Sequence, residues 1–446
     1  MQGPAAVTDD ASPPRAPAPK AAPQEVELKL HLPADAVRGL LRHPALAALR
    51  RGSTRRQRLV SVYCDTPDGH LARAGVGLRL RRSHGHWLQT LKGPARGGAA
   101  AGLAVRDEFE WPLAGPASRL PALDLGRIAE TPWSEVVARA LRKAPLGPRF
   151  TTDFMRTTIP LGFADGTTAM LCIDRGNIVA SGAGEVGAEP PRVPISELEV
   201  ELGEGDPARL FELVIALVDD LPLRVETQSK AARGFALVEA HASVPVHAEA
   251  AAIASEASTG EALGAFLGSC IDQIAANRDG LLASEDPEWI HQMRVGVRRL
   301  RSALDLLRDL PLPVPIDPLR DEARWLGSAL GPARDLDVFA AQTLPMLAAT
   351  AHHAPPDTGL DRDLEDLTQS ARERLPVVRA TAREAVASAR FERLLLSVGR
   401  LAVTVAQTAP CEPTGEMTLG IPAKQFASRV LDKRARKLKR HARKLA

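Results

Sequence analysis

The sequence predicts an α+β protein in which an antiparallel β-barrel with flanking helices is followed by an all-α helical bundle. From Gln24 to about Ala240, short runs of alternating polar and apolar residues are separated by turn signals such as Pro67-Asp68-Gly69. After about residue 250, Ala, Leu, Arg and Glu recur at helical spacing. A chain of 446 residues also exceeds one ordinary hydrophobic core, so two domains are expected.

The chain divides into three predicted segments, the last two joined by a short linker. Residues 1–22 are rich in Pro and Ala, lack periodicity and are expected to be disordered. The barrel domain is expected at 23–240 and the helical domain at 255–446. Helices are expected near 34–50, 134–143 and 207–219 in the barrel domain. The helices expected in the second half are 259–283, 287–309, 317–330, 335–350, 359–386 and 388–408.

Charged residues alternate with aliphatic residues at the start of the barrel domain. Glu25, Glu27 and Lys29 are separated by Val26 and Leu28, so in a strand the three charges share one face. Taken alone, this pattern also fits a half-exposed strand of an ordinary sheet.

The same two-residue period recurs in other predicted strands. It is carried by Glu197, Glu199 and Glu201, by Glu108 and Glu110, by Arg79 and Arg81, and by the stretch that ends at Lys92. Acidic and basic strands each have an apolar opposite face, which favours a closed barrel with a charged interior. Clustered carboxylates imply a bound cation, and oxygen ligands favour Mg²⁺ or Mn²⁺. Clustered Arg and Lys imply a multiply charged anion, so the interior is expected to perform phosphoryl transfer.

Composition points to a cytoplasmic protein. The four cysteines are isolated, which is typical of a reducing compartment, and no signal peptide or run of about 18 apolar residues is evident. His84 and His86 lie in a turn-like segment and are interpreted as loop histidines rather than zinc ligands. The net charge of +3 is small, but residues 424–444 are strongly basic.

The first half of the chain resembles the CYTH, or triphosphate tunnel metalloenzyme, superfamily. Glu25-Val26-Glu27-Leu28-Lys29 is similar to its ExExK signature, and the later blocks follow in the family's order over about 24–240. Those blocks are Tyr63–Pro67, Leu78–Arg82, Thr90–Gly93, Arg106–Glu110, Cys172–Gly176, Glu197–Glu201 and Ser229-Lys230.

The resemblance implies roles for individual side chains. Glu25, Glu27 and Lys29 would be catalytic. The expected metal ligands are Glu25, Glu27, Glu108, Glu110, Asp174, Glu197, Glu199 and Glu201. The expected phosphate-binding residues are Arg58, Arg79, Arg81, Lys92, Arg156, Lys230 and Arg233.

The helical half resembles a CHAD domain, the usual companion of bacterial CYTH domains. The resemblance is carried by the segments 291–301 and 331–338. His291, Arg294, Arg298 and Arg301 fall at helical spacing on one face, and the resemblance implies that they bind polyphosphate. A second basic helix and further helices are expected in such a domain, so this half is predicted to be incomplete. Association with polyphosphate granules is a further expectation.

The expected reaction is metal-dependent hydrolysis of inorganic triphosphate to pyrophosphate and phosphate. An adenylate cyclase or a thiamine triphosphatase would use the same tunnel, and a non-catalytic polyphosphate-binding protein is the alternative outside enzymes. Nucleic acid is disfavoured as a partner because the basic run at 424–444 lacks interleaved aromatic residues. Neither the oligomeric state nor a membrane association is indicated by the sequence.

Overall fold

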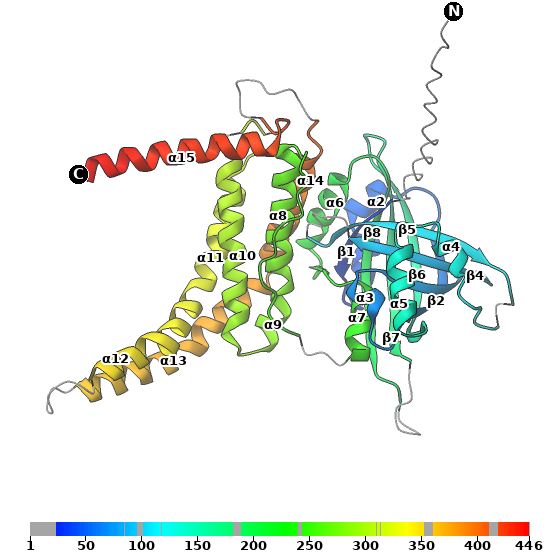
Figure 1. The fold of residues 1–446 in the computed structure, drawn as a ribbon, viewed down its shortest axis with the longest axis horizontal. Helices are drawn as coiled ribbons and strands as arrows, with labels where there is room; N and C mark the ends of the chain where they lie inside the picture. Colours follow the sequence, from blue (N-terminus) through cyan, green and yellow to red (C-terminus); the bar gives the residue numbers. More distant parts are fainter. Residues whose placement is uncertain are drawn as a thin grey trace, which may run out of the picture.

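The computed structural model describes residues 24–445 apart from 84, 96–100, 117, 182–188, 240–242, 309, 313, 352–359 and 410–417. The segment predicted to be disordered, together with His84 and Cys411, lies outside the described residues. Figure 1 shows a β-barrel beside a bundle of long helices. The predicted α+β class is therefore confirmed.

Eight antiparallel strands form a closed barrel. They are hydrogen-bonded in the order β5-β4-β3-β2-β6-β7-β8-β1, and β1 pairs with β5 to close the ring. The short strand β9 pairs with β1. The strands are β1 (Gln24–His31), β2 (Arg55–Asp65), β3 (Gly77–Ser83), β4 (His86–Ala95), β5 (Leu103–Leu113), β6 (Gly147–Gly162), β7 (Thr168–Ala180), β8 (Arg192–Glu204) and β9 (Arg224–Val225).

Most helices of this half cover the apolar outer face of the barrel, whereas the helix Lys230–Glu239 packs against its inner side through Phe235. The helix predicted near 34–50 is two helices, because Pro44 follows an extended His43. The predicted helices near 134–143 and 207–219 are present, and α7 was not expected from the sequence. These helices are α1 (Val37–Arg42), α2 (Pro44–Leu49), α3 (His70–Arg73), α4 (Leu125–Ile128), α5 (Ser134–Lys143), α6 (Ala208–Val218) and α7 (Lys230–Glu239).

The second half is helical throughout its regular elements. The expected single helix at 259–283 is interrupted at Asn277. This residue is the C-cap of the first helix and the N-cap of the second. The elements are α8 (Thr259–Ala276), α9 (Arg278–Ala283), α10 (Pro287–Leu307), α11 (Asp317–Val338), the π-helix η1 (Phe339–Thr343), α12 (Leu344–Ala351), α13 (Leu360–Val386), α14 (Ala389–Ala406) and α15 (Ala423–Leu445).

One expected helix break in the second half is absent. The sequence predicted separate helices at 317–330 and 335–350, but α11 continues through Pro332 to Val338. Leu330, Gly331 and Ala333 are buried around this proline, so their packing keeps the helix intact although one backbone donor is missing. The irregularity instead lies in η1, whose wider turn joins α11 to α12.

A single hydrophobic core joins the barrel to the helical domain. It combines the outer faces of β1, β7 and β8 with α6 and with residues of α8, α10, α11 and α14, including the fully buried Leu28, Phe211 and Leu395. Inside the barrel, a separate apolar cluster that contains Phe150, Phe154 and Phe235 packs against α7. The two halves are thus joined by this shared core as well as by the linker.

Asp65, in the turn block Tyr63–Pro67, has a structural role. Its buried carboxylate accepts hydrogen bonds from the backbone N–H groups of Thr66 (2.7 Å), Leu71 (2.9 Å) and Ala72 (2.9 Å). It therefore ties the end of β2 to α3 and has no free oxygen for a ligand.

We expect Asp65→Asn to lower the free energy of unfolding by about 1–3 kcal/mol, because an amide NH₂ group would face backbone donors. Chemical denaturation checks this value. Asp68→Asn, at an exposed position three residues later, is the matched control and is expected to unfold like the parent protein. Equal stability of the two variants would contradict this role of Asp65.

Candidate active site

The barrel encloses a charged cavity of about 870 Å³. Its wall includes twelve of the residues predicted from the sequence; strand alternation points eleven of them inward, and Lys230 reaches the cavity from the start of α7. They are Glu25, Glu27, Lys29, Arg79, Arg81, Lys92, Glu108, Glu110, Arg156, Glu199, Glu201 and Lys230. Ser229, Phe235 and Glu239, at the start of and within α7, also line the cavity.

Glu25, Glu27 and Glu201 form the first carboxylate cluster. Each offers an oxygen atom, and the three atoms lie within 4.8 Å of one another. Glu27 faces Glu201 across the pair formed by β1 and β8. Burial raises the pKa of Glu201, and repulsion from Glu199, Glu27 and Glu25 adds to it, against the attraction of Arg156. A crowded set of hard oxygen donors that repel one another fits a divalent cation.

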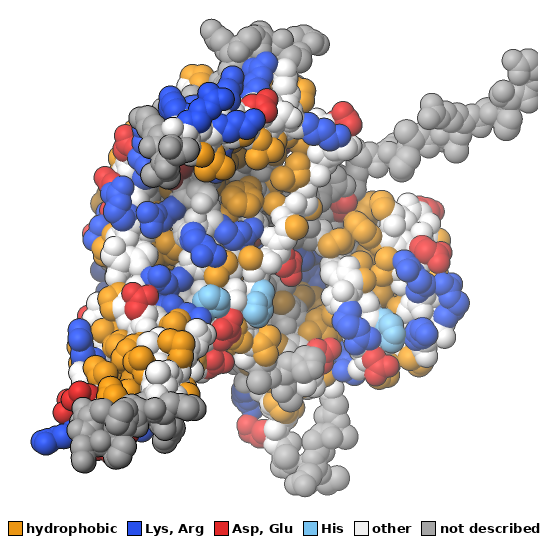
Figure 2. All heavy atoms as spheres, turned by 60° about the vertical axis from the view of Figure 1, so that its left-hand side comes forward, with side chains coloured by type: hydrophobic (Ala, Val, Ile, Leu, Met, Phe, Trp, Pro, Cys, Tyr) orange, Lys and Arg blue, Asp and Glu red, His pale blue; other side chains and the backbone are white. Residues whose placement is uncertain are grey.

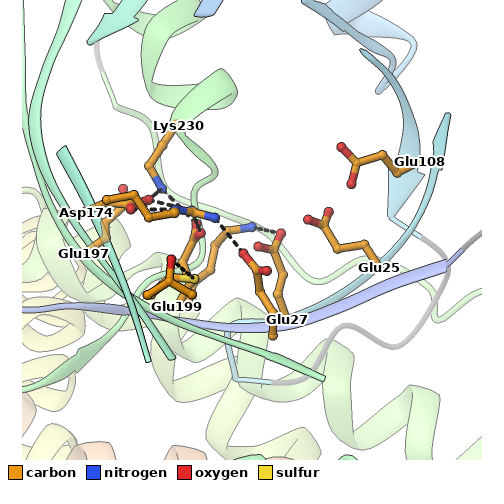
Figure 3. Close-up of polar contacts among 12 residues, drawn as sticks. Glu25, Glu27, Glu108, Asp174, Glu197, Glu199 and Lys230 are labelled. Carbon is orange, nitrogen blue, oxygen red and sulfur yellow. Dashed lines mark hydrogen bonds and ion pairs between the residues drawn. The ribbon is translucent and has the colours of Figure 1, made fainter. Parts of the chain in front are cut away.

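Asp174, Glu197 and Glu199 form the second carboxylate cluster. Figure 3 shows Lys230 pointing toward all three, with Glu25 and Glu108 on the other side of the interior. The ammonium of Lys230 contacts Asp174 and Glu199 at 2.8 Å each and also Glu197. Arg156 contacts Asp174 at 2.7 Å, and Arg233 contacts Glu197. Three cations therefore neutralise this cluster.

The pKa of Glu199 reflects that neutralisation. Burial opposes its charged form, but Lys230, Arg156 and Lys29 outweigh this effect and hold the pKa well below the usual range. The same pairing raises the pKa of Lys230, although burial alone would lower it.

Each acid of the first cluster has a cationic partner of its own, Lys92 for Glu25, Lys29 for Glu27 and Arg156 for Glu201. Lys230 contacts all three acids of the second cluster, and Arg156 and Arg233 add to it. The second cluster is thus the more heavily compensated of the two, and the first cluster is the better candidate metal centre.

Basic side chains of β3, β4 and β5 form the opposite wall. Arg79 donates to the Glu108 carboxylate at 3.2 Å and to the Tyr63 hydroxyl at 3.4 Å. Lys92 contacts Glu25 and lies 3.4 Å from Glu108. Burial opposes the charge of Arg79, but Tyr63 and Glu108 raise its pKa.

Arg81 differs from its neighbours because it has no acidic partner among the described residues. Its Nε atom is buried without a hydrogen-bond partner, and the Nε of Arg106 is in the same state. Burial, together with the charges of Arg79 and Arg156, lowers the pKa of Arg81 to about 10, so it is still a cation at neutral pH. Arg81 is half-buried beside Arg79 and Arg156, and only the longer-range attraction of Tyr63 and Glu108 offsets their repulsion, so this position favours a bound anion.

Four predicted site residues do not line the cavity. Asp174, Glu197 and Arg233 lie behind it in the second cluster. Arg58 lies outside the barrel wall, where it forms a two-pronged hydrogen bond with Asp153 (Nε–Oδ1 2.8 Å, Nη2–Oδ2 2.5 Å). Because Tyr63 of the same strand points inward, a residue five positions earlier must point outward.

The sequence interpretation missed several cavity residues, of which Tyr63 and Arg106 lie beside the predicted charges. Tyr63 and Arg106 line the interior, and Arg106 lies directly across from Glu25 where β1 and β5 close the barrel. Arg106 has the same two-residue period as Glu108 and Glu110, so that pattern could have identified it.

A second charged hollow lies on the helical domain. It has a volume of about 490 Å³ and is lined by all four predicted residues, His291, Arg294, Arg298 and Arg301. Arg334 of α11, which was not among the predicted binding residues, joins them. Figure 2 shows that Lys and Arg side chains gather on this face. Burial and the neighbouring Arg334 lower the pKa of His291, which indicates a strongly positive environment.

The fold and the cavity define a class: a closed barrel whose interior is lined by clustered carboxylates and basic side chains, attached to a helical domain with a basic cleft. Residues 23–235 match the CYTH domain and residues 265–446 match the CHAD domain. The chain therefore consists of a CYTH domain followed by a CHAD domain.

Known proteins resemble each half. An inorganic triphosphatase of Haemophilus influenzae is 32% identical over 179 residues, which cover 40% of this chain and 46% of that protein. The chain thus spans about half the length of this curated relative. The crystal structure of a CHAD domain from Ricinus communis is 34% identical, covers 45% of this chain and 61% of that chain, and has a TM-score of 0.36.

A Hippeastrum protein proposed to be an adenylyl cyclase, for which a dominant triphosphatase activity is described, is 17% identical. The match covers 48% of this chain and 95% of that chain, with a TM-score of 0.31. The barrel assignment rests instead on the strand register of this chain. Within the described residues, no helix is long and apolar enough to cross a membrane.

Proposed function

We propose that the barrel hydrolyses inorganic tripolyphosphate to pyrophosphate and phosphate. The observation that carries the proposal is the unpaired Arg81, which lies with Arg79 and Arg106 in a cavity that also holds the carboxylates of Glu25, Glu27 and Glu201. Basic side chains whose donors are not all used, as the Nε atoms of Arg81 and Arg106 show, fit the several negative charges of a triphosphate. The identity of the Haemophilus influenzae relative supports the same reaction.

The cavity residues divide the work of this reaction. Arg79, Arg81 and Lys92 would bind and orient the phosphate chain, and Lys29 would hold Glu27 through its ion pair. Glu25, Glu27 and Glu201 would hold Mg²⁺ or Mn²⁺. When bound, such a cation neutralises charge on phosphoryl oxygens and acidifies water. The carboxylates and the basic wall together would align water with the terminal phosphorus, and no side-chain nucleophile is required.

Product analysis tests the proposal. The purified full chain is incubated with tripolyphosphate, ATP or thiamine triphosphate, with Mg²⁺ or Mn²⁺, and phosphate, pyrophosphate and cyclic AMP are measured. We expect phosphate and pyrophosphate from tripolyphosphate, with the highest kcat/KM for that substrate. Pyrophosphate with cyclic AMP from ATP would show a cyclase, and preference for thiamine triphosphate would show a thiamine triphosphatase. No turnover of any substrate would sink the enzymatic proposal.

The basic cleft of the helical domain is proposed to bind long polyphosphate. We expect Arg298→Ala combined with Arg301→Ala to weaken the binding of long-chain polyphosphate about tenfold or more, because charge-assisted contacts to phosphate are lost. Fluorescence anisotropy with labelled polyphosphate measures the affinity.

The matched control for this prediction is Arg372→Ala combined with Arg374→Ala, which removes two exposed arginines of α13 outside the cleft. Its affinity is expected to stay near that of the parent chain. Equal weakening by both pairs would show that only net charge matters. Tripolyphosphate turnover is expected to be unchanged in both pairs, since neither lies in the barrel.

A further inference from the structure

The backbone of Lys29 is held by two segments outside its own strand. Its N–H donates to the carbonyl of Gly102 at 3.1 Å, and its carbonyl accepts from the N–H of Glu226 at 3.0 Å. Its side chain points into the cavity and contacts Glu27 of the first carboxylate cluster. The direction of the ammonium group therefore depends on where these two segments lie.

Both segments are braced by α14 of the helical domain. The N–H of Val225, next to Glu226, donates to Oε2 of Glu392 at 2.8 Å. Ala101, next to Gly102, packs on α14 so closely that a Cβ added at Gly399 would lie 2.9 Å from the Ala101 Cβ. A Cβ added at Gly102 would lie 2.7 Å from the Lys29 carbonyl oxygen. These contacts leave little freedom behind Lys29.

Both carboxylate oxygens of Glu392 are held in place by buried hydrogen bonds. Only 3% of it is exposed, and its second carboxylate oxygen accepts from Nη1 of Arg278 at 2.9 Å. Arg278 is also buried, at 5% exposure. An ion pair withdrawn from water in this way needs well-formed hydrogen bonds on both oxygens, and the Val225 N–H supplies one of them. Glu392 does not line the cavity.

The adjacent residue offers a contrast. Arg393 also bridges the two domains, through an ion pair with Asp219 at the end of α6, but both side chains are about half exposed at 49% and 47%. That pair touches neither segment behind Lys29. Removing it therefore weakens the contact between the two domains without touching β1, the strand of Lys29, which makes it a matched control.

We propose that Glu392 of the helical domain is a positioning residue for Lys29, acting through the hydrogen bond to Val225 and the Glu226–Lys29 contact. The role in turnover rests on the proposed function of the cavity. By this route the helical domain helps to set the geometry of the first carboxylate cluster, because Lys29 pairs with Glu27. A conservative substitution of Glu392 should then lower the rate of tripolyphosphate hydrolysis in the barrel.

The test compares four variants of the full chain: Glu392→Ala, Glu392→Asp, Glu392→Gln and Arg393→Ala. Asp keeps the charge for Arg278 but withdraws the acceptor from Val225. Gln keeps a carbonyl acceptor for Val225 at the same length, but its NH₂ group then faces Arg278, so this variant is expected to lose stability through the ion pair while it keeps the contact to β9. We expect the Ala and Asp variants to lower kcat for tripolyphosphate about tenfold or more with KM within about twofold, as for a misplaced active group. The Gln variant should recover most of kcat, and Arg393→Ala should match the parent.

Two further readouts do not depend on turnover. Hydrogen exchange at the amides of β1 and β9 is expected to be faster in the Ala and Asp variants and unchanged in Arg393→Ala. Mn²⁺ affinity should fall in the same order as kcat. If the parent protein hydrolyses none of the substrates, the proposed function is wrong. Hydrogen exchange and Mn²⁺ affinity would still test whether Glu392 positions Lys29. Unchanged exchange and affinity in Glu392→Asp, or equal losses in Arg393→Ala, would overturn the role of Glu392.

Discussion

Replacing Glu27 with Gln is expected to abolish tripolyphosphate hydrolysis while the protein remains folded. Glu27 is the most buried member of the first carboxylate cluster, at 4% exposure, and it is surrounded by Glu25, Glu201 and the Lys29 ammonium. An amide of the same shape keeps an oxygen but removes one negative charge from the candidate metal centre. We expect kcat to fall at least about a hundredfold, the scale of a lost electrostatic contact to the transition state.

The measurement combines phosphate release, Mn²⁺ affinity and thermal unfolding. Mn²⁺ binding is expected to weaken about tenfold or more, and the unfolding temperature should stay close to that of the parent because shape and packing are kept. Asp153→Asn is the matched control, since it makes the same chemical change in a strand carboxylate outside the cavity, where Asp153 pairs with Arg58. Full turnover in Glu27→Gln would refute the metal centre.

Replacing Arg81 with Ala is expected to separate activity from stability. In the absence of an anion, Arg81 is a half-buried cation beside Arg79 and Arg156 that forms no ion pair among the described residues. Its removal should raise KM and lower kcat together, with kcat/KM about a hundredfold lower, because the same contact holds substrate and transition state. The unfolding temperature should not fall, since an unpaired charge is removed.

Arg79→Ala provides the comparison for this prediction. It should impair both kinetic parameters as well, but it should also lower the unfolding temperature because Glu108 and Tyr63 lose their partner. Added tripolyphosphate, without metal, is expected to stabilise the parent protein more than either variant. If Arg81→Ala changed neither kinetics nor ligand stabilisation, Arg81 would not contact the phosphate chain.

Strand periodicity predicted most of the cavity wall. The run from Glu25 to Lys29 and the run from Glu197 to Glu201 place their charges on one face whatever the rest of the chain does, because strand side chains alternate strictly. Arg58 shows the limit of this reasoning. The segment Arg55-Arg56-Gln57-Arg58 carries arginines in both phases, and only the inward direction of Tyr63 in the folded β2 excludes Arg58.

The division between the two carboxylate clusters could not be predicted from the sequence. Both have three acids on neighbouring strands, and the resemblance assigned metal ligands to both. The difference comes from Lys230, at the start of the unexpected helix α7, which contacts all three acids of the second cluster. Arg156 of β6 reaches both clusters, through Asp174 in the second and Glu201 in the first. Arg156 faces Asp174 across the β6–β7 pair, but the position of Lys230 depends on how α7 packs against β6, β7 and β8.

The sequence by itself determined the class of fold and the charged character of the barrel interior, because alternation and helical spacing are local properties of the chain. It also determined the helix face that carries His291, Arg294, Arg298 and Arg301. Only the tertiary structure decided which carboxylates are already neutralised, that Arg81 lacks a partner among the described residues, and that Glu392 reaches the strand of Lys29. These features depend on which strands and helices become neighbours, and a local pattern does not contain that information.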